Sequence, residues 1–218
     1  MIHVFIISVP SAAERRSHVY NVKTRLESHG CIVEIIDGLY YKQVDIIGLL
    51  YGAGMIYDVP DKSVSLSQIG CFLSHRCVWQ KIADMSVGDH YLVLEDDMDV
   101  CDDFSAEELL GVIPQDYDCA FVWKHPYLEH KQAAELINPH ISRFYGGWGT
   151  CAYLLQPTAA AYCLKELRSV FAPVDIMLNR NVWPNLRTYV TVKDYFINKG
   201  YIGDGDKGDY LFKSLVWG

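Results

Sequence analysis

Residues 91–99 read Tyr-Leu-Val-Leu-Glu-Asp-Asp-Met-Asp, an apolar run that ends in a group of carboxylates. Four apolar or aromatic residues bounded by polar ones predict a buried strand. In an open α/β sheet the ligand crevice lies at the carboxyl ends of the strands. Because side chains alternate along a strand, Glu95, Asp97 and Asp99 are expected on one side while the strand continues, with Asp96 on the other. Glu95 and Asp97 thus form an acid-x-acid pair that suits a hard divalent cation.

The surrounding charges point the same way. From Asp84 to Glu108 every formal charge is negative, with no Lys or Arg. Such a concentration repels itself unless a cation or solvent offsets it. A solvated acidic loop without a ligand is the alternative interpretation. An EF-hand loop is disfavoured, because counting Asp97 as position one puts Asp102 at position six, where Gly is required.

Composition sets the broad class. The 218 residues are 50% hydrophobic, which predicts one domain over residues 1–218 with an ample core. The net charge of −8 argues against nucleic acid as a partner, because nucleic-acid binding relies on basic patches. Seven cysteines, none in a C-x-x-C pair, predict reduced, buried thiols in a cytosolic compartment rather than a zinc ribbon.

No run of about twenty apolar residues is present, so we expect a soluble, cytoplasmic protein. The aromatic tail Tyr210–Trp217 leaves two interpretations open. It either makes a peripheral membrane contact or packs as a C-terminal segment.

The order of elements predicts a parallel sheet. Residues 2–9 read as a strand, 12–29 as a helix and 31–37 as a second strand, which is how a parallel sheet with right-handed crossovers begins. A capping box at residues 65–68 predicts a helix to about residue 85. Further helices are expected at 106–112 and 158–167, and further strands at 118–123, 151–155 and 187–192.

Several blocks then occur in one order. They are Ile6-Ile7-Ser8 with Glu14-Arg15-Arg16, Gln68-Ile69-Gly70-Cys71-Phe72-Leu73-Ser74-His75 with Trp79, Val93-Leu94-Glu95-Asp96-Asp97, Gly149-Thr150-Cys151-Ala152-Tyr153-Leu154-Leu155, and Pro173-Val174-Asp175. Together, over about residues 2–178, they resemble glycosyltransferase family 25, which includes lipooligosaccharide and collagen hydroxylysine galactosyltransferases. The pairing of the second and third blocks is specific, whereas either alone is weak. One departure is Ser67-Gln68 where the family usually has Gly-Glu.

The resemblance implies a GT-A type fold, a single Rossmann-like and mostly parallel sheet flanked by helices. It implies inverting transfer of galactose or glucose from a UDP-sugar donor, with Mn²⁺ or Mg²⁺ as cofactor. The implied acceptor is a hydroxyl of a glycan, a lipid-linked glycan or hydroxylysine.

Within this resemblance, Asp97 is the leading metal ligand and Glu95 a second ligand that also contacts the donor. Asp96 is a donor-binding candidate, with bracing of the strand as the alternative. Arg15 and Arg16 begin the first helix, where a phosphate gains from backbone NH groups and positive charge. Salt bridges to Glu14 or Glu27 are the alternative for these arginines.

The remaining donor-binding candidates come from four places. Ser8 belongs to the first block, and Asp37 ends the second strand, where a plain turn is equally compatible. Ser74 and His75 lie in one helix, and core packing of His75 beside Trp79 is the alternative. Gly149 and Thr150 follow a glycine-rich approach in which Trp148 either stacks on a sugar or is simply buried.

Inversion needs a base that takes the proton of the acceptor hydroxyl. Asp175 is the candidate by its resemblance to the last block, with a helix N-cap as the alternative. Asp204, Asp206 and Asp209 either complete the metal site from the tail or make turns.

Three hypotheses therefore compete. The first is a metal-dependent glycosyltransferase. The second is a catalytically inactive scaffold or carbohydrate-binding protein, which the Ser67-Gln68 departure motivates. The third is a carboxylate-based metal hydrolase of phosphate esters, with which only the acidic stretch is compatible.

Overall fold

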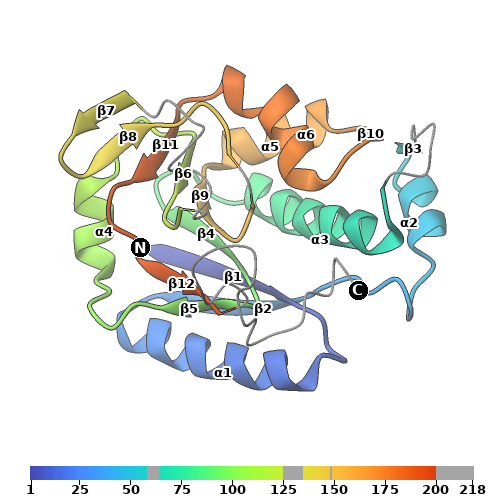
Figure 1. Cartoon of the computed structure of the whole chain (residues 1–218), viewed down its shortest axis with the longest axis horizontal. Coiled ribbons are helices and arrows are strands. Elements are labelled where there is room, and N and C mark those ends of the chain that lie inside the picture. Colours follow the sequence, from blue (N-terminus) through green and yellow to red (C-terminus); the bar gives the residue numbers. More distant parts are fainter. Residues whose placement is uncertain (58–63, 125–134, 148, 200–218) are drawn as a thin grey trace, which may run out of the picture.

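An eight-stranded sheet forms the centre of the protein (Figure 1). The computed structural model describes residues 1–57, 64–124, 135–147 and 149–199. The strand order is β2-β1-β4-β9-β6-β11-β8-β7. Their bounds are Ile2–Ser8 (β1), Ile32–Asp37 (β2), His90–Glu95 (β4), Cys119–Phe121 (β6), Glu135–Asn138 (β7), Ile141–Arg143 (β8), Ala152–Leu155 (β9) and Thr188–Thr191 (β11).

The sheet is mixed in its pairings but mostly parallel in its strand directions. β1 pairs in parallel with both β2 and β4, and β6 pairs in parallel with β11. β9 is antiparallel to its neighbours β4 and β6, and β8 is antiparallel to β11 and β7. Six of these eight strands therefore run one way, and only β9 and β8 oppose them. The α/β class with one helix-flanked sheet, predicted from the sequence, is confirmed.

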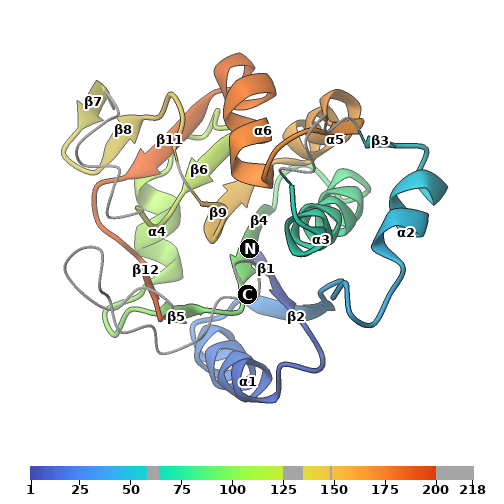
Figure 2. The same ribbon diagram turned by 45° about the vertical axis from the view of Figure 1, so that its right-hand side comes forward.

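Helices cover both faces of the sheet (Figure 2). On one face, α3 and α5 pack together, with α2 and α6 against α3. On the other, α1 and α4 share a second apolar cluster. The bounds are Ala13–Ser28 (α1), Ile46–Gly52 (α2), Leu66–Ala83 (α3), Ala106–Val112 (α4), Pro157–Glu166 (α5) and Val174–Asn181 (α6).

The two faces explain why β1 and β4 read as continuous apolar runs. In β1, Phe5 and Ile7 belong to the cluster under α3, whereas Val4 and Ile6 belong to the cluster over α1. A strand that is buried on both faces has apolar side chains at every position, so its sequence shows no alternation of polar and apolar residues. Their carboxyl ends are therefore the first places where polar side chains appear.

Short strands outside the main sheet were not predicted. β5 (Met98–Val100) pairs with β12 (Phe196–Asn198), and β3 (Ile56–Tyr57) pairs with β10 (Ser169–Val170). The central strand consequently ends at Glu95, and a turn precedes β5. The expectation that Asp99 joins the acidic face is wrong, since Asp99 forms ion pairs with Arg25 and Lys199 instead.

The seven cysteines are free. Cys31, Cys119 and Cys163 are buried as predicted, but Cys77 is exposed and the other three are partly exposed. Among the described residues, the helices include none with the length and apolar character needed to cross a membrane.

Candidate active site

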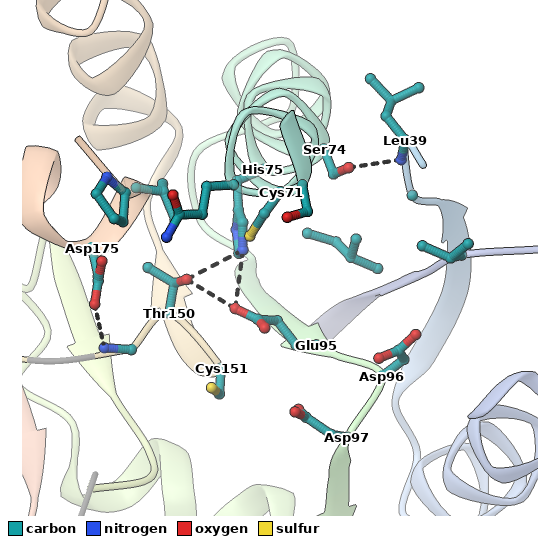
Figure 3. A pocket seen from close by; sticks show the side chains of 18 of the residues that line it. Leu39, Cys71, Ser74, His75, Glu95, Asp96, Asp97, Thr150, Cys151 and Asp175 are labelled. Atoms are coloured by element: carbon teal, nitrogen blue, oxygen red, sulfur yellow. Dashed lines mark hydrogen bonds and ion pairs between the residues drawn. The ribbon is translucent and has the colours of Figure 1, made fainter. Parts of the chain in front are cut away.

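A pocket of about 260 Å³ lies at the carboxyl ends of β1 and β4, facing the first half of α3 (Figure 3). Seven predicted donor-site residues line it together with the predicted metal ligand Asp97 and the predicted base Asp175. The seven are Arg15, Ser74, His75, Glu95, Asp96, Gly149 and Thr150. Five segments separated along the chain thus converge on one cavity.

Glu95, the last residue of β4, is held by two side chains. Thr150 Oγ1 donates a hydrogen bond of 2.9 Å to Glu95 Oε1, and His75 Nε2 lies 3.3 Å from the same oxygen. Burial opposes ionisation of Glu95, but the contacts with His75 and Thr150 and the charge of Arg15 outweigh it. The pKa of Glu95 is therefore lowered from its ordinary value. Glu95 is an ionised acceptor.

A buried hydrogen-bonded chain supports this carboxylate from behind. His75 Nδ1 lies 2.9 Å from the Tyr153 hydroxyl, which accepts a hydrogen bond of 2.9 Å from Trp79 Nε1. Because ionised Glu95 only accepts, the hydrogen bond between them is donated by Nε2 of His75. His75, Trp79 and Tyr153 are fully buried. His75 therefore orients Glu95 and packs beside Trp79, as the core-packing alternative predicted, and its donor-binding role stays a prediction.

Asp96 points away from Glu95 and is paired with Arg15 of α1. Burial raises the pKa of Asp96, and the adjacent Arg15 guanidinium counteracts only part of that effect. Arg15 Nη1 also lies 3.9 Å from Asp97 Oδ2. Asp96 thus holds the arginine that sits beside the predicted metal ligand.

Asp97 is the least satisfied carboxylate of the site. Its Oδ1 is buried and has no hydrogen-bond partner among the residues that the structure describes. Burial, followed by repulsion from Glu95, raises the pKa of Asp97 from 3.8 to about 7. A buried carboxylate oxygen without a donor is costly, and a bound cation would remove that cost.

Carboxylate oxygens of Asp97 and Glu95 lie close enough together to bind one metal ion. One atom each of Glu95, Asp97 and Cys151 lies within 4.8 Å of the others, and Cys71, His75 and Glu95 form a second such group. Burial raises the pKa values of the Cys71 and Cys151 thiols well above their ordinary value, so both remain protonated. The carboxylates are the available charged ligands, and such oxygens suit Mn²⁺ or Mg²⁺. The residues present therefore fit the predicted cation.

Asp175 lies across the pocket, in the first turn of α6. Its Oδ2 accepts a hydrogen bond of 3.1 Å from the Gly149 backbone N–H, and its Oδ1 accepts one of 2.9 Å from Ile176 N–H. The N-cap position of α6 is Pro173, so Asp175 is not the N-cap. Gly149 has φ of +83°, a conformation that favours glycine and that brings its N–H to Asp175.

Three predicted donor-binding residues lie outside the pocket lining. Arg16 Nη1 donates to the Ser8 carbonyl at 3.1 Å, and Arg16 Nη2 lies 2.9 Å from Asp37 Oδ1. Ser8 and Asp37 are register partners in β1 and β2. Arg16 therefore ties the ends of two strands together, with Asp37 as its ion-pair partner rather than Glu14 or Glu27. The donor-binding roles of these three residues stay predictions.

Ser74 shapes one wall of the pocket. Its hydroxyl donates a hydrogen bond of 2.7 Å to the Gly70 carbonyl and accepts one of 2.8 Å from the Leu39 N–H. Leu39 and Tyr40, which line the pocket, follow the turn after β2 and were missed from the sequence. Only the spacing of Cys71 four residues before His75 on α3 could have signalled that Cys71 faces the same cavity.

Some predictions fall outside the described residues. These are the stacking role of Trp148, the tail acids Asp204, Asp206 and Asp209, and the aromatic segment 210–217. They stay predictions.

Comparison with known proteins identifies the class of protein to which this site belongs. The site combines carboxylates and an arginine at the carboxyl end of the central strand, where open α/β sheets have their ligand crevice. The family described as glycosyltransferase family 25 (LPS biosynthesis protein) matches residues 1–178. The chain belongs to this family, and its helix-flanked, mostly parallel sheet is the architecture that the sequence predicted.

Three relatives show the range of the family. A probable inactive glycosyltransferase 25 family member 3 of Bos taurus is 25% identical over 80% of this chain and 31% of its own length. Procollagen galactosyltransferase 2 of Homo sapiens is 29% identical over 44% of this chain and 15% of its length. The lacto-N-neotetraose biosynthesis glycosyltransferase LgtB of Neisseria meningitidis is 27% identical over 79% of this chain and 66% of its length. The chain thus spans less than a third of the first of these.

Proposed function

We propose that this protein is a metal-dependent glycosyltransferase that moves galactose or glucose, with inversion, from a UDP-sugar to a hydroxyl of an acceptor. The observation that carries the proposal is the buried Oδ1 of Asp97, which has no hydrogen-bond partner within the described part of the chain, beside the ionised Glu95. Membership of the family supports the transfer of a sugar.

Glu95 and Asp97 would hold Mn²⁺ or Mg²⁺, whose charge stabilises the departing diphosphate. A chain of net charge −8 needs such a bridge, because its carboxylates would otherwise repel the donor phosphates. Arg15 sits 3.9 Å from Asp97 and lines the same cavity, so its guanidinium adds a second positive charge for a phosphate.

Asp175 is the residue that we assign to the acceptor. Its carboxylate lines the pocket across from Glu95, and its hydrogen bond to the Gly149 N–H fixes its orientation. We assign to Asp175 the removal of the proton from the attacking hydroxyl, as inversion requires.

The acceptor is proposed from the named relatives. One relative bears the name of a lacto-N-neotetraose biosynthesis enzyme and another that of a procollagen galactosyltransferase. A glycan or lipid-linked glycan is therefore proposed first, with a hydroxylysine side chain as the other acceptor.

A ligand panel tests the proposal. The melting temperature of the 218-residue chain is measured with UDP, UDP-galactose and UDP-glucose, each with and without Mn²⁺, and donor hydrolysis is followed in parallel. A ligand at 100 times its Kd raises the free energy of unfolding by about 2.7 kcal/mol. We expect the shift to need both Mn²⁺ and nucleotide.

Two variants make the panel specific. Asp97→Asn should abolish the Mn²⁺-dependent shift and turnover. Asp102→Asn is the matched control, because Asp102 lies in the same acidic stretch with a fully exposed side chain. Equal responses of the two variants would refute the metal assignment.

A catalytically inactive carbohydrate-binding protein is the second candidate. A relative named as probably inactive covers most of this chain. Gln68, which replaces the usual family Glu, uses its side chain to accept from the Ser65 N–H in a capping box, a structural role. Binding of UDP-sugars or glycans without any turnover in the same panel would favour this candidate.

A further inference from the structure

A second pocket, of about 430 Å³, opens beside α2, α3 and α5, away from the site described above. Its walls are the turn after α2 (53–55), part of α5 and three cations, which are Arg76, Lys165 and Arg168. No carboxylate occurs among the described residues that line it. Three positive charges without a lining acid are unusual in a chain with eight excess negative charges.

Arg76 has a structural partner. Its Nη1 donates to the carbonyls of Leu164 and Leu167, at 3.2 and 3.4 Å. These carbonyls end α5, where a cation is favoured by the helix dipole. The helix end thus accounts for Arg76.

No contact of this kind explains the position of Arg168 in the pocket. Arg168 is exposed, and its guanidinium makes no hydrogen bond or ion pair with the described residues. Lys165 has only a loose ion pair, 3.6 Å from Glu166. Burial, and then the charge of Arg168, lowers the pKa of Arg76, so the two guanidinium groups repel each other. An anion placed between them would relieve this repulsion.

We propose that this pocket binds a phosphate-bearing anion through Arg168 and Lys165, with Arg76 adding its charge. Guanidinium groups match phosphate oxygens with two parallel hydrogen bonds, and an ammonium group adds a point charge. A phospholipid headgroup and a soluble phosphate ester present this same chemistry. The inference is independent of the proposed transferase function, because it uses none of the residues of the first pocket.

Calorimetric titration with inorganic phosphate, in the absence of divalent cations, tests the pocket. Loss of one hydrogen bond to a charged group costs about 1.5–3 kcal/mol, so Arg168→Ala should weaken phosphate binding at least tenfold. Lys165→Ala combined with Arg168→Ala should abolish it. Arg180→Ala removes an exposed cation of α6 that lines neither pocket, and it should bind as the unmodified chain does. Arg76 is left in place because it holds α5.

Vesicle sedimentation identifies the source of the phosphate. Binding to phosphatidylglycerol vesicles but not to phosphatidylcholine vesicles, lost in Arg168→Ala, would support a lipid headgroup. Phosphate binding that depends on Arg168, without vesicle binding, would support a soluble phosphate ester. Absence of binding to both probes, or equal losses in the Arg168 and Arg180 variants, would overturn the proposal.

Discussion

Asp97 and Glu95 show how two carboxylates two residues apart acquire opposite properties. Glu95 accepts from Thr150 and contacts His75, and its pKa is lowered. Asp97 has one oxygen without a partner among the described residues, and its pKa is raised to about 7. Because environment rather than residue type sets these directions, the acid-x-acid pattern alone does not distinguish the two.

The raised pKa predicts how the stability of the metal-free protein depends on pH. The folded state keeps the Asp97 proton to higher pH than the unfolded chain, so the free energy of unfolding should fall as pH rises from about 4 to about 7. The shift from 3.8 to about 7 sets an upper limit of about 4 kcal/mol on this fall. Urea unfolding in chelator at several pH values measures it.

Asp97→Asn carries no titrating group and should lose this part of the pH dependence, unfolding at higher urea than the unmodified chain at pH 7. The exposed Asp102→Asn variant should retain the dependence. Parallel stability curves for all three proteins between pH 4 and 7 would contradict the burial of an ionisable Asp97.

Asp175→Asn tests the base at the same scale. The amide oxygen can still accept from the Gly149 N–H, so the local structure should survive. If Asp175 removes the acceptor proton, kcat should fall about 10²- to 10⁴-fold while the Mn²⁺-dependent UDP shift stays unchanged. A kcat within about threefold of the unmodified enzyme would rule out this role.

At the scale of elements, α3 organises the pocket. Its capping box at Ser65 and Gln68 was predicted and is present. The helix approaches the loop after β2 so closely that a Cβ on Gly70 would lie 2.5 Å from the Leu39 carbonyl oxygen. Gly70 therefore sets the distance between α3 and the loop that lines the pocket.

Gly70→Ala is expected to push this loop away. The clash with backbone should reduce the free energy of unfolding by about 1–3 kcal/mol and weaken ligand binding. Gly111→Ala is the control, because a Cβ there meets nothing within 4 Å and alanine favours the helix by up to about 1 kcal/mol. Urea midpoints of the two variants measure the difference. Equal stability of both would mean that α3 and the loop can separate freely.

At the scale of the whole molecule, the part beyond the family match completes the sheet. The match ends at residue 178, yet β11 lies between β6 and β8, and β12 pairs with β5 directly after the acidic turn. The segment after Asn179 therefore contributes an interior strand, at the place where the sequence predicted a strand over 187–192.

Ending the chain after Leu178 should therefore abolish cooperative unfolding, because it removes an interior strand and leaves β6 unpaired on one side. A chain that ends after Lys199 keeps every element that the structure describes and should unfold in a single transition. Circular dichroism during urea titration distinguishes them. Cooperative unfolding of the shorter chain would show that β11 is dispensable.

The sequence by itself determined the local features of this protein. Sequence patterns placed four of the helices and six strands of the main sheet to within a few residues, but they missed α2, α6, β7 and β8. The abrupt change from apolar to acidic residues marked the end of β4. Short strands such as β5 and β12 were not predicted, because three residues are too few to show a period-two pattern. These strands form only by pairing with each other across almost a hundred positions of sequence.

Only the tertiary structure decided how the marked residues are used. Arg15 meets Asp96 across 81 positions, and Thr150 meets Glu95 across 55. Arg16 follows Arg15 in the sequence, yet it links the ends of β1 and β2 and does not line the pocket. Local propensity acts over a few residues, whereas the charge state and partners of a buried carboxylate depend on whichever distant segments the packing brings to it.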